Sequence, residues 1–524
     1  MCESDRPYNQ RLVNSPSSIR SVKNLSSSAK NNQYFQTEHL NADLKGRSVR
    51  GGAITMAAQA CKFGLSLGSN IVLARMLTPA DYGLIGMVTT VTGFITLFKD
   101  LGLSMATVQK DEISHEQVSN LFWVNVALAV ITALIAAATA PAVAQFYHEP
   151  RLIWITLTLT IGFIISGLGV QHSALLNRQM HYGALVFNDV FSMLISTVAA
   201  IVAAMYGASY WALVILPLTS ATISTAGLWL VCKWRPSLPT RKSGTRSMLA
   251  FGGNLTGFNA INYFARNLDN VLIGRFWGVQ QLGLYSKAYQ LLLLPLSQIN
   301  DPITKVAVPT LSRLADSPER YRQVYLRILE KLALLTMPIV VFMVATSDWL
   351  VQIILGSQWN DASRLFMLLG FAGVLQPIAS STGWLFISQG RTHHMFQWGV
   401  IGSTTAVVSF FIGLPWGATG VATSYSIIWI CVTMPLLFWF VGRTGPIRTK
   451  DFYITPAPIA FAALCTALVL VAFRKWVAVS DPVVGCGVAF GITGTIFLIT
   501  LFALPKGRLI VQDLRNLSSM LKAA

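Results

Sequence analysis

Long apolar runs, separated by short polar breaks, make up most of the sequence from residue 51 onward. A helix that crosses a hydrocarbon core about 30 Å thick needs about 20 residues, and most of the runs approach or exceed that length. The runs are 51–73, 83–98, 121–140, 152–174, 184–206, 210–231, 247–273, 282–299, 328–345, 365–387, 395–415, 421–440, 454–473 and 483–504. This pattern predicts an all-α integral membrane protein with about 14 transmembrane helices.

The composition supports the same class of protein. Hydrophobic residues account for 53% of the chain and charged residues for only 11%, and the mean hydropathy is +0.55. A soluble domain carries a smaller apolar and a larger charged fraction. The first 50 residues differ from the rest, because they are polar and contain no apolar run long enough for the core of a signal peptide. They are predicted to form a disordered cytoplasmic tail.

The net charge of +18 could indicate nucleic acid, but the basic residues are scattered through the predicted loops without a nucleic-acid-binding motif. Cytoplasmic loops of membrane proteins retain an excess of Lys and Arg. With the amino terminus inside, the inner segments hold 30 of the 39 basic residues and the outer loops hold six. This bias predicts that both termini are cytoplasmic and that no nucleic acid is bound.

The two halves of the sequence resemble each other. The segment NIVLARMLTPADYGL, which starts at Asn70, aligns without a gap to NVLIGRFWGVQQLGL, which starts at Asn270. Two further matches follow in the same order at nearly the same spacing, and six spans per repeat would give two bundles in parallel orientation. The predicted domains are a tail (1–50), an N-terminal six-helix bundle (51–232), a basic cytoplasmic connector (233–246), a C-terminal six-helix bundle (247–441), and a last helix pair with a cytoplasmic tail (442–524).

Three basic residues lie inside predicted spans: Lys62, Arg266 and Lys287. A charge at the bilayer centre costs roughly 2.5–3.5 kcal/mol on the insertion scale. One interpretation is that they line a water-filled lumen that attracts an anionic headgroup such as a pyrophosphate. The other is that each pairs locally or reaches the interface, and Asp269 is a candidate partner of Arg266 because it lies three residues further along the helix.

Other polar residues accompany these cations. Asn267, Asp269 and Asn270 give the seventh span a polar segment, which suits a lumen that binds sugar, although hydrogen bonds between helices would explain it equally well. The repeat-related Arg75 and Arg275 follow the outer ends of their spans, where residues usually cap carbonyls or fix a turn.

No motif for catalysis is present in the sequence. There is no Walker-type glycine loop, no HExxH and no GxSxG, and the seven histidines form no catalytic cluster. The six cysteines lack the spacing of metal ligands. We therefore expect no enzyme activity, catalytic residue, metal site or cofactor.

Four segments carry a resemblance to a known family. They are LARMLTPADYGLIGM at Leu73, DLGLSMATVQKDEISHEQVSNLFWVNV at Asp100, NDPITKVAVPTLSRL at Asn300 and LGSQWNDA at Leu355. With these segments, residues 44 to about 504 resemble the Wzx-type polysaccharide repeat-unit flippases of the multidrug/oligosaccharidyl-lipid/polysaccharide exporter superfamily. The chain looks closest to the branch that includes the colanic-acid flippase.

The resemblance implies two six-helix bundles around a cationic lumen in the bacterial cytoplasmic (inner) membrane. It implies a transporter that flips undecaprenyl-pyrophosphate-linked oligosaccharide for exopolysaccharide, capsule or O-antigen synthesis. Membrane lipids, a polysaccharide polymerase and export machinery would be its partners. The family's cationic lumen residues map onto Lys62 and Arg266. The alternatives are a drug or metabolite antiporter of the same superfamily, a membrane glycan polymerase, and a scaffold for the assembly machinery.

Overall fold

The computed structural model describes residues 35, 44–96, 103–109, 113–240 and 246–510. All regular secondary structure in these ranges is helical. Most of the predicted tail lies outside them, and its last seven residues already belong to the first described helix, which begins at Leu44. The helices are α3 (Leu44–Met76), α4 (Pro79–Thr96), α5 (Leu103–Gln109), α6 (His115–Tyr147), α7 (Arg151–Gly167), α8 (Val170–Arg178), α9 (Tyr182–Met205), α10 (Trp211–Val231), α11 (Arg246–Ser312), α12 (Pro318–Ala345), α13 (Ser347–Ile354), η1 (Ser357–Trp359), α14 (Asn360–Ser388), α15 (Thr392–Gly413), η2 (Leu414–Trp416), α16 (Gly417–Ile428), η3 (Trp429–Thr433), α17 (Met434–Gly442), α18 (Asp451–Ile454), α19 (Ala457–Trp476) and α20 (Pro482–Ala503).

Local sequence explains where several of these helices begin and end. Helix α6 starts with a capping box, in which the Ser114 side chain accepts from the Gln117 backbone and the Gln117 side chain accepts from the Ser114 backbone. It ends at His148, which adopts the left-handed conformation typical of a helix end. Helix α20 starts with Pro482 after an Asp481 cap. Short polar signals between apolar runs thus set the helix ends.

Within the described ranges the apolar runs fall on helices, and several helices extend further than the runs, as α12 does by beginning at Pro318, ten residues before the run that starts at 328. Nine helical segments in the described part of the chain are long and apolar enough to cross a membrane. Two continuous segments each carry two predicted runs: α11, which turns at Gly278, and the segment from Thr392 to Gly442. The total of fourteen spans therefore stays a prediction.

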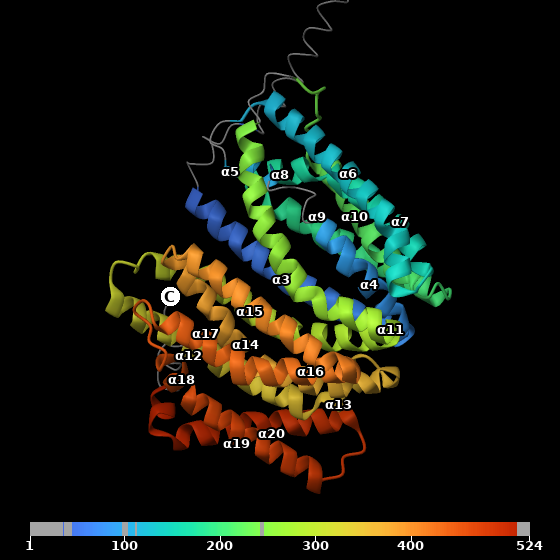
Figure 1. The fold of residues 1–524 in the computed structure, drawn as a ribbon. Coiled ribbons are helices and arrows are strands. Elements are labelled where there is room, and N and C mark those ends of the chain that lie inside the picture. Colours follow the sequence, from blue (N-terminus) through green and yellow to red (C-terminus); the bar gives the residue numbers. More distant parts are fainter. Residues whose placement is uncertain (1–34, 36–43, 97–102, 110–112, 241–245, 511–524) are drawn as a thin grey trace, which may run out of the picture.

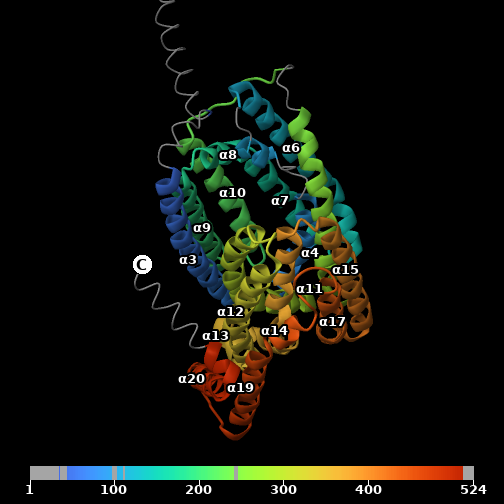
Figure 2. The ribbon, with the colours of Figure 1, turned by 90° about the vertical axis from the view of Figure 1, so that its left-hand side faces the viewer.

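The helices form two groups joined by α11. In Figure 1, α3 to α10 lie in the upper part of the molecule, α12 to α17 in the lower part, and α19 with α20 at the bottom. The first part of α11 runs along α4 and the second part returns into the lower group after Gly278, where the backbone has a φ of 77°. Figure 2 shows α3 and α9 on one side of the molecule, and α11 and α15 on the other.

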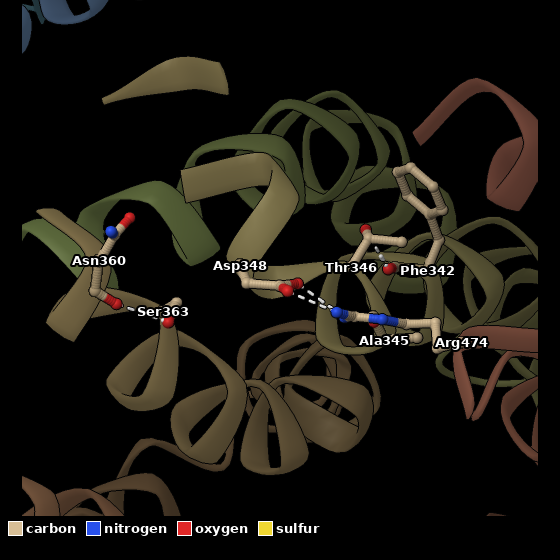
Figure 3. Close-up of polar contacts among 7 residues, drawn as sticks. All are labelled: Phe342, Ala345, Thr346, Asp348, Asn360, Ser363 and Arg474. Carbon is tan, nitrogen blue, oxygen red and sulfur yellow. Dashed lines mark hydrogen bonds and ion pairs between the residues drawn. The ribbon is translucent and has the colours of Figure 1, made fainter. Parts of the chain in front are cut away.

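The last two long helices are fixed to the lower group by an ion pair. The Arg474 guanidinium on α19 binds both carboxylate oxygens of Asp348 at the start of α13, and it donates to the Ala345 carbonyl at 2.6 Å (Figure 3). It also lies 4.5 Å from the centre of the Trp349 ring. The two bonds to the carboxylate, the third acceptor and the aromatic face together fix the distance and the orientation of α19 relative to α13.

Candidate functional site

The two groups of helices meet where α4 and the second part of α11 cross. At this crossing a methyl group on Gly83 would lie 1.8 Å from the Val279 carbonyl oxygen, and one on Gly283 would lie 1.8 Å from the Pro79 carbonyl oxygen. Only glycine permits backbones to approach so closely. Gly83 and Gly283 are the repeat-related glycines of the sequence alignment, so the crossing has an approximate twofold relation.

Hydrogen bonds close the same end of the molecule. The Gln358 side-chain amide donates to the carbonyls of Ala74 at 2.5 Å and Leu77 at 2.8 Å, and the Trp359 indole N–H donates to the Ala74 carbonyl at 2.8 Å. The Trp359 ring also packs edge-on against Tyr82. The end of α3 would otherwise leave its last carbonyls without a helical partner, and the opposite group now satisfies two of them.

The repeat-related arginines also reach across to the opposite group. Arg75 donates to the Ile353 carbonyl at 2.5 Å, and Arg275 is 3.1 Å from the His148 imidazole Nε2 and lies over the Phe146 ring. The acceptor of Arg75 is a backbone carbonyl near the end of α13, so this arginine caps a helix of the other half of the chain. We call the glycine crossing, these arginines, Gln358 and Trp359 the clasp.

Lys287 lies beside the clasp, with only 4% of its surface exposed. Its ammonium donates to Asn70 Oδ1 at 2.7 Å and to Gln290 Oε1 at 3.2 Å, and it lies 4.1 Å from the centre of the Tyr82 ring. Neutral oxygens and an aromatic face solvate the charge, and no carboxylate in the described part of the chain forms an ion pair with it. In this state Lys287 holds the two halves together and does not face a lumen.

Lys62 forms an ion pair that the sequence analysis did not anticipate. Its ammonium is 2.5 Å from an oxygen of Asp189 on α9, and the side chains are 31% and 48% exposed. The sequence separation of 127 residues gave no signal for this pairing, although the packing of α3 on α9 produces it. The lysine is thus compensated but remains accessible.

Arg266 is exposed, and it has no hydrogen bond or ion pair in the part of the chain that the structure describes. The proposed pairing with Asp269 is wrong. Asp269 is buried, and its carboxylate accepts from the Tyr285 hydroxyl at 2.9 Å and from the Asn270 backbone N–H at 2.8 Å. Tyr285 comes from the second part of α11, so the turn at Gly278 brings a competing donor to the acid.

The side chains of the remaining predicted residues have different surroundings from those of Arg266. Asn267 donates to the Tyr263 carbonyl at 2.9 Å and lines a mostly apolar groove of about 330 Å³ between α4, α6 and α11. Asn270 keeps a buried side-chain oxygen without a partner. The structure therefore does not gather the six candidates into one site, and it leaves Lys62 and Arg266 as the two with accessible charge.

Comparison with known proteins places this architecture in a family. The model of the family described as "Polysaccharide biosynthesis protein" matches residues 72–364, which is more than half of the chain. The chain is similar to the teichuronic acid biosynthesis protein TuaB of Bacillus subtilis (strain 168), with 26% identity over 71% of this chain and 76% of that protein. It is also similar to the lipopolysaccharide biosynthesis protein WzxC of Escherichia coli (strain K12), with 24% identity over 76% of this chain and 81% of that protein.

The fold is similar to that of a solved transporter. The lipid II flippase MurJ in an inward closed conformation superimposes with a TM-score of 0.68 over 87% of this chain and 98% of that chain, at 13% identity. This likeness confirms the predicted all-helical fold, and the family match confirms the resemblance found in the sequence. The chain belongs to the polysaccharide biosynthesis protein family and is a multi-pass membrane protein whose fold is similar to that of the lipid II flippase MurJ.

Proposed function

We propose that this protein flips undecaprenyl-pyrophosphate-linked oligosaccharides from the cytoplasmic to the outer leaflet of a bacterial inner membrane, with both termini in the cytoplasm. The accessible cations Lys62 and Arg266, on α3 and α11, carry the proposal. A pyrophosphate needs cationic donors, and a hydrophobic membrane protein retains such residues where they contact water or an anion. No chemical step is required, so the protein acts as a transporter and not as an enzyme.

The Lys62–Asp189 pair suits reversible binding of an anion. Because both side chains are partly exposed, the net stabilisation from the pair is only about 0–1 kcal/mol. A pyrophosphate offers more negative charge and more acceptor oxygens than one carboxylate. The pyrophosphate can therefore replace Asp189 as the partner of Lys62 at little cost in free energy. The Lys62–Asp189 ion pair can form again after the substrate leaves.

The clasp supports alternating access as the mechanism. It joins the end of α3 to α13 and η1, beside the Gly278 turn of α11, and the charge bias assigns this end to the outer side, so this state is closed toward the outside. Opening on that side would break the contacts of Gln358 and Trp359 and free Lys287 from Asn70. The Lys287 ammonium would then be exposed on the outer side, where it would attract the anionic headgroup as the substrate leaves.

The antiporter for cationic drugs remains the second candidate from the sequence, and it requires accessible acids. Asp269 is buried, and Asp189 is already paired with a lysine. Arg266 is exposed and without an ion pair among the described residues. The exposed arginine and the lack of an exposed, unpaired acid among these candidate residues favour an anionic substrate. A glycan polymerase and export machinery would act on the flipped product.

The test is the leaflet distribution of lipid-linked oligosaccharide in cells that lack the protein. We expect the precursor to accumulate on the cytoplasmic face, wild type to restore flipping, and Lys62→Ala or Arg266→Ala to restore little. Arg151→Ala is the matched control, since this exposed arginine pairs with Glu149 in a turn outside the candidate site. Normal transfer without the protein would refute the flippase, and full rescue by both variants would refute the cationic path.

A further inference from the structure

A cavity lined by both polar and apolar residues lies within the N-terminal group of helices, apart from the clasp. Its volume is about 430 Å³, within the range of roughly 300–1,000 Å³ typical of small-molecule sites. Helices α4, α5, α7, α8 and α10 contribute its walls. On α10 the lining residues Ala221, Ser224, Thr225 and Leu228 recur at helical spacing, so one face of that helix is turned toward the cavity.

Hydroxyl groups and one amide provide the polar part of the lining, and none of the described residues that line the cavity is charged. The polar residues are Thr96, Ser104, Ser166, Ser173, Asn177, Ser224 and Thr225. Three of the hydroxyls donate to backbone carbonyls: Thr96 to Gly93 at 2.8 Å, Ser166 to Gly162 at 2.7 Å and Thr225 to Ile165 at 3.1 Å. A hydroxyl whose proton is used in this way can still accept, so Thr96 and Thr225 offer lone pairs to a ligand that donates.

Other groups on the wall can donate. The side chains of Ser173 and Asn177 on α8 have no hydrogen bond with any part of the chain that the structure describes. Ser224 accepts from the Asn188 amide at 3.3 Å, which leaves the Ser224 proton free for a ligand. Donors and acceptors are therefore mixed, without a charge. A sugar ring has the matching set, since each of its hydroxyls both donates and accepts, whereas a phosphate or an isoprenoid chain does not.

The cavity is also linked to the proposed headgroup site. Asn188, which holds Ser224, directly precedes Asp189, the partner of Lys62. Asn188 reaches α10 because position 227 is a glycine, where a methyl group would lie 1.9 Å from the Asn188 side-chain oxygen. Asn188 thus connects the helix that carries Asp189 to the helix that lines the cavity.

We propose that this cavity binds an uncharged sugar ring of the transported oligosaccharide while the pyrophosphate is held by Lys62. The inference rests on the proposed function and adds to it a place where the glycan is recognised. The wall with its hydroxyl groups favours rings without carboxylate or phosphate substituents, because an anion there would have no cation among the described lining residues.

Binding measurements on the full-length protein in lipid nanodiscs test the proposal. The probes are undecaprenyl pyrophosphate, and the same lipid carrying the host oligosaccharide, extracted from cells that lack the protein. Ala221→Leu fills the cavity from α10, and Ala226→Leu adds the same bulk to an exposed position on another face of that helix. Native mass spectrometry of each variant gives the dissociation constants.

We expect wild type to bind the sugar-bearing lipid about tenfold more tightly than the bare lipid, which corresponds to about 1.4 kcal/mol. Ala221→Leu should remove this preference without changing the affinity for the bare lipid, and Ala226→Leu should retain it. The released oligosaccharide should compete with the sugar-bearing lipid in wild type and fail to do so in Ala221→Leu. Unchanged binding of the bare lipid also shows that the variant is folded.

Three outcomes would overturn the proposal. Equal affinity of wild type for both lipids, or a preference that survives Ala221→Leu, would show that the cavity does not bind the sugar, while the flippase function would stand. Equal losses in Ala221→Leu and Ala226→Leu would show a general effect of bulk on α10. Failure of wild type to bind either lipid would refute the proposed function itself.

Discussion

The glycine crossing at the clasp gives the sharpest test of how the two halves separate. Alanine at position 83 or 283 would place a methyl group 1.8 Å from a carbonyl oxygen of the opposite helix, and real contacts of this kind are not shorter than 3.0 Å. The backbones must therefore separate. Overpacking of a close contact costs about 1–3 kcal/mol, and here the cost falls on the closed state alone. The ratio of closed to open molecules should fall by roughly 5- to 150-fold.

Helix propensity does not reverse this expectation. Alanine favours a helix over glycine by about 1 kcal/mol, but both positions are helical in the closed state and should stay helical when the halves part, so this gain cancels between the two states. Gly68→Ala on α3 is the matched control, because a methyl group there would meet no atom within 4 Å. It introduces the same chemical change without the contact.

Pulsed electron paramagnetic resonance can report the change. Spin labels at Met76→Cys and Ser357→Cys, both at exposed positions on opposite sides of the clasp, would be introduced into protein without its native cysteines. We expect Gly83→Ala and Gly283→Ala to add a population with a longer distance, and the double variant to enlarge it. If the distance distributions of Gly83→Ala and Gly283→Ala both match that of Gly68→Ala, the reasoning is refuted. The glycine crossing would then not determine the ratio of closed to open molecules.

The other predictions concern three ion pairs. Lys62→Asp should reduce flipping. Adding Asp189→Lys should restore the ion pair but not the transport, because the cation then lies on α9 and not on α3. Equal flipping by the double variant and wild type would contradict a role for the position of the cation. Burial by itself would raise the pKa of Asp451, but hydrogen bonds from Arg322 and from the Arg448 backbone outweigh it and hold the pKa below its usual range. The stabilisation by this carboxylate is therefore fully present above an unfolded pKa of about 3.9 and is lost as pH falls through the lower folded pKa. Arg322→Ala should therefore lower the melting temperature at pH 7 more than at pH 3. The expected loss in the free energy of unfolding at pH 7 is about 1–2 kcal/mol. Arg474→Gln should lower the melting temperature without abolishing substrate binding, and an unchanged melting curve would show that α19 is held by packing alone.

Part of the site was predictable because some signals are local or repeated. The matching segments at Asn70 and Asn270 placed Gly83 and Gly283 in equivalent positions, although their role was visible only when the helices crossed. Lys62 was singled out because a charge in an apolar run is costly. The cavity of the N-terminal group was not found, since serine and threonine residues spaced along separate helices carry no signal in one dimension.

One wrong pairing and one missed pairing have a common cause. The spacing of Arg266 and Asp269 allowed an ion pair on one helix face, yet Tyr285 captures the carboxylate after the turn at Gly278. In the same way, Asp189 had no visible partner until α9 packed beside α3 and brought it to Lys62. Sequence spacing predicts neighbours within a helix, but it cannot predict a competitor from another one.

The sequence by itself determined that this protein is helical, lies in a membrane and is built from two similar halves. Those properties follow from the length and apolarity of each run, which lipid imposes on every segment separately because backbone groups must be satisfied within it. The tertiary structure alone decided which end is closed, which charges are compensated and where an uncharged ring could bind. These depend on how side chains from distant helices approach one another, and that approach is set by packing of whole helices, down to the glycines that allow their backbones to touch.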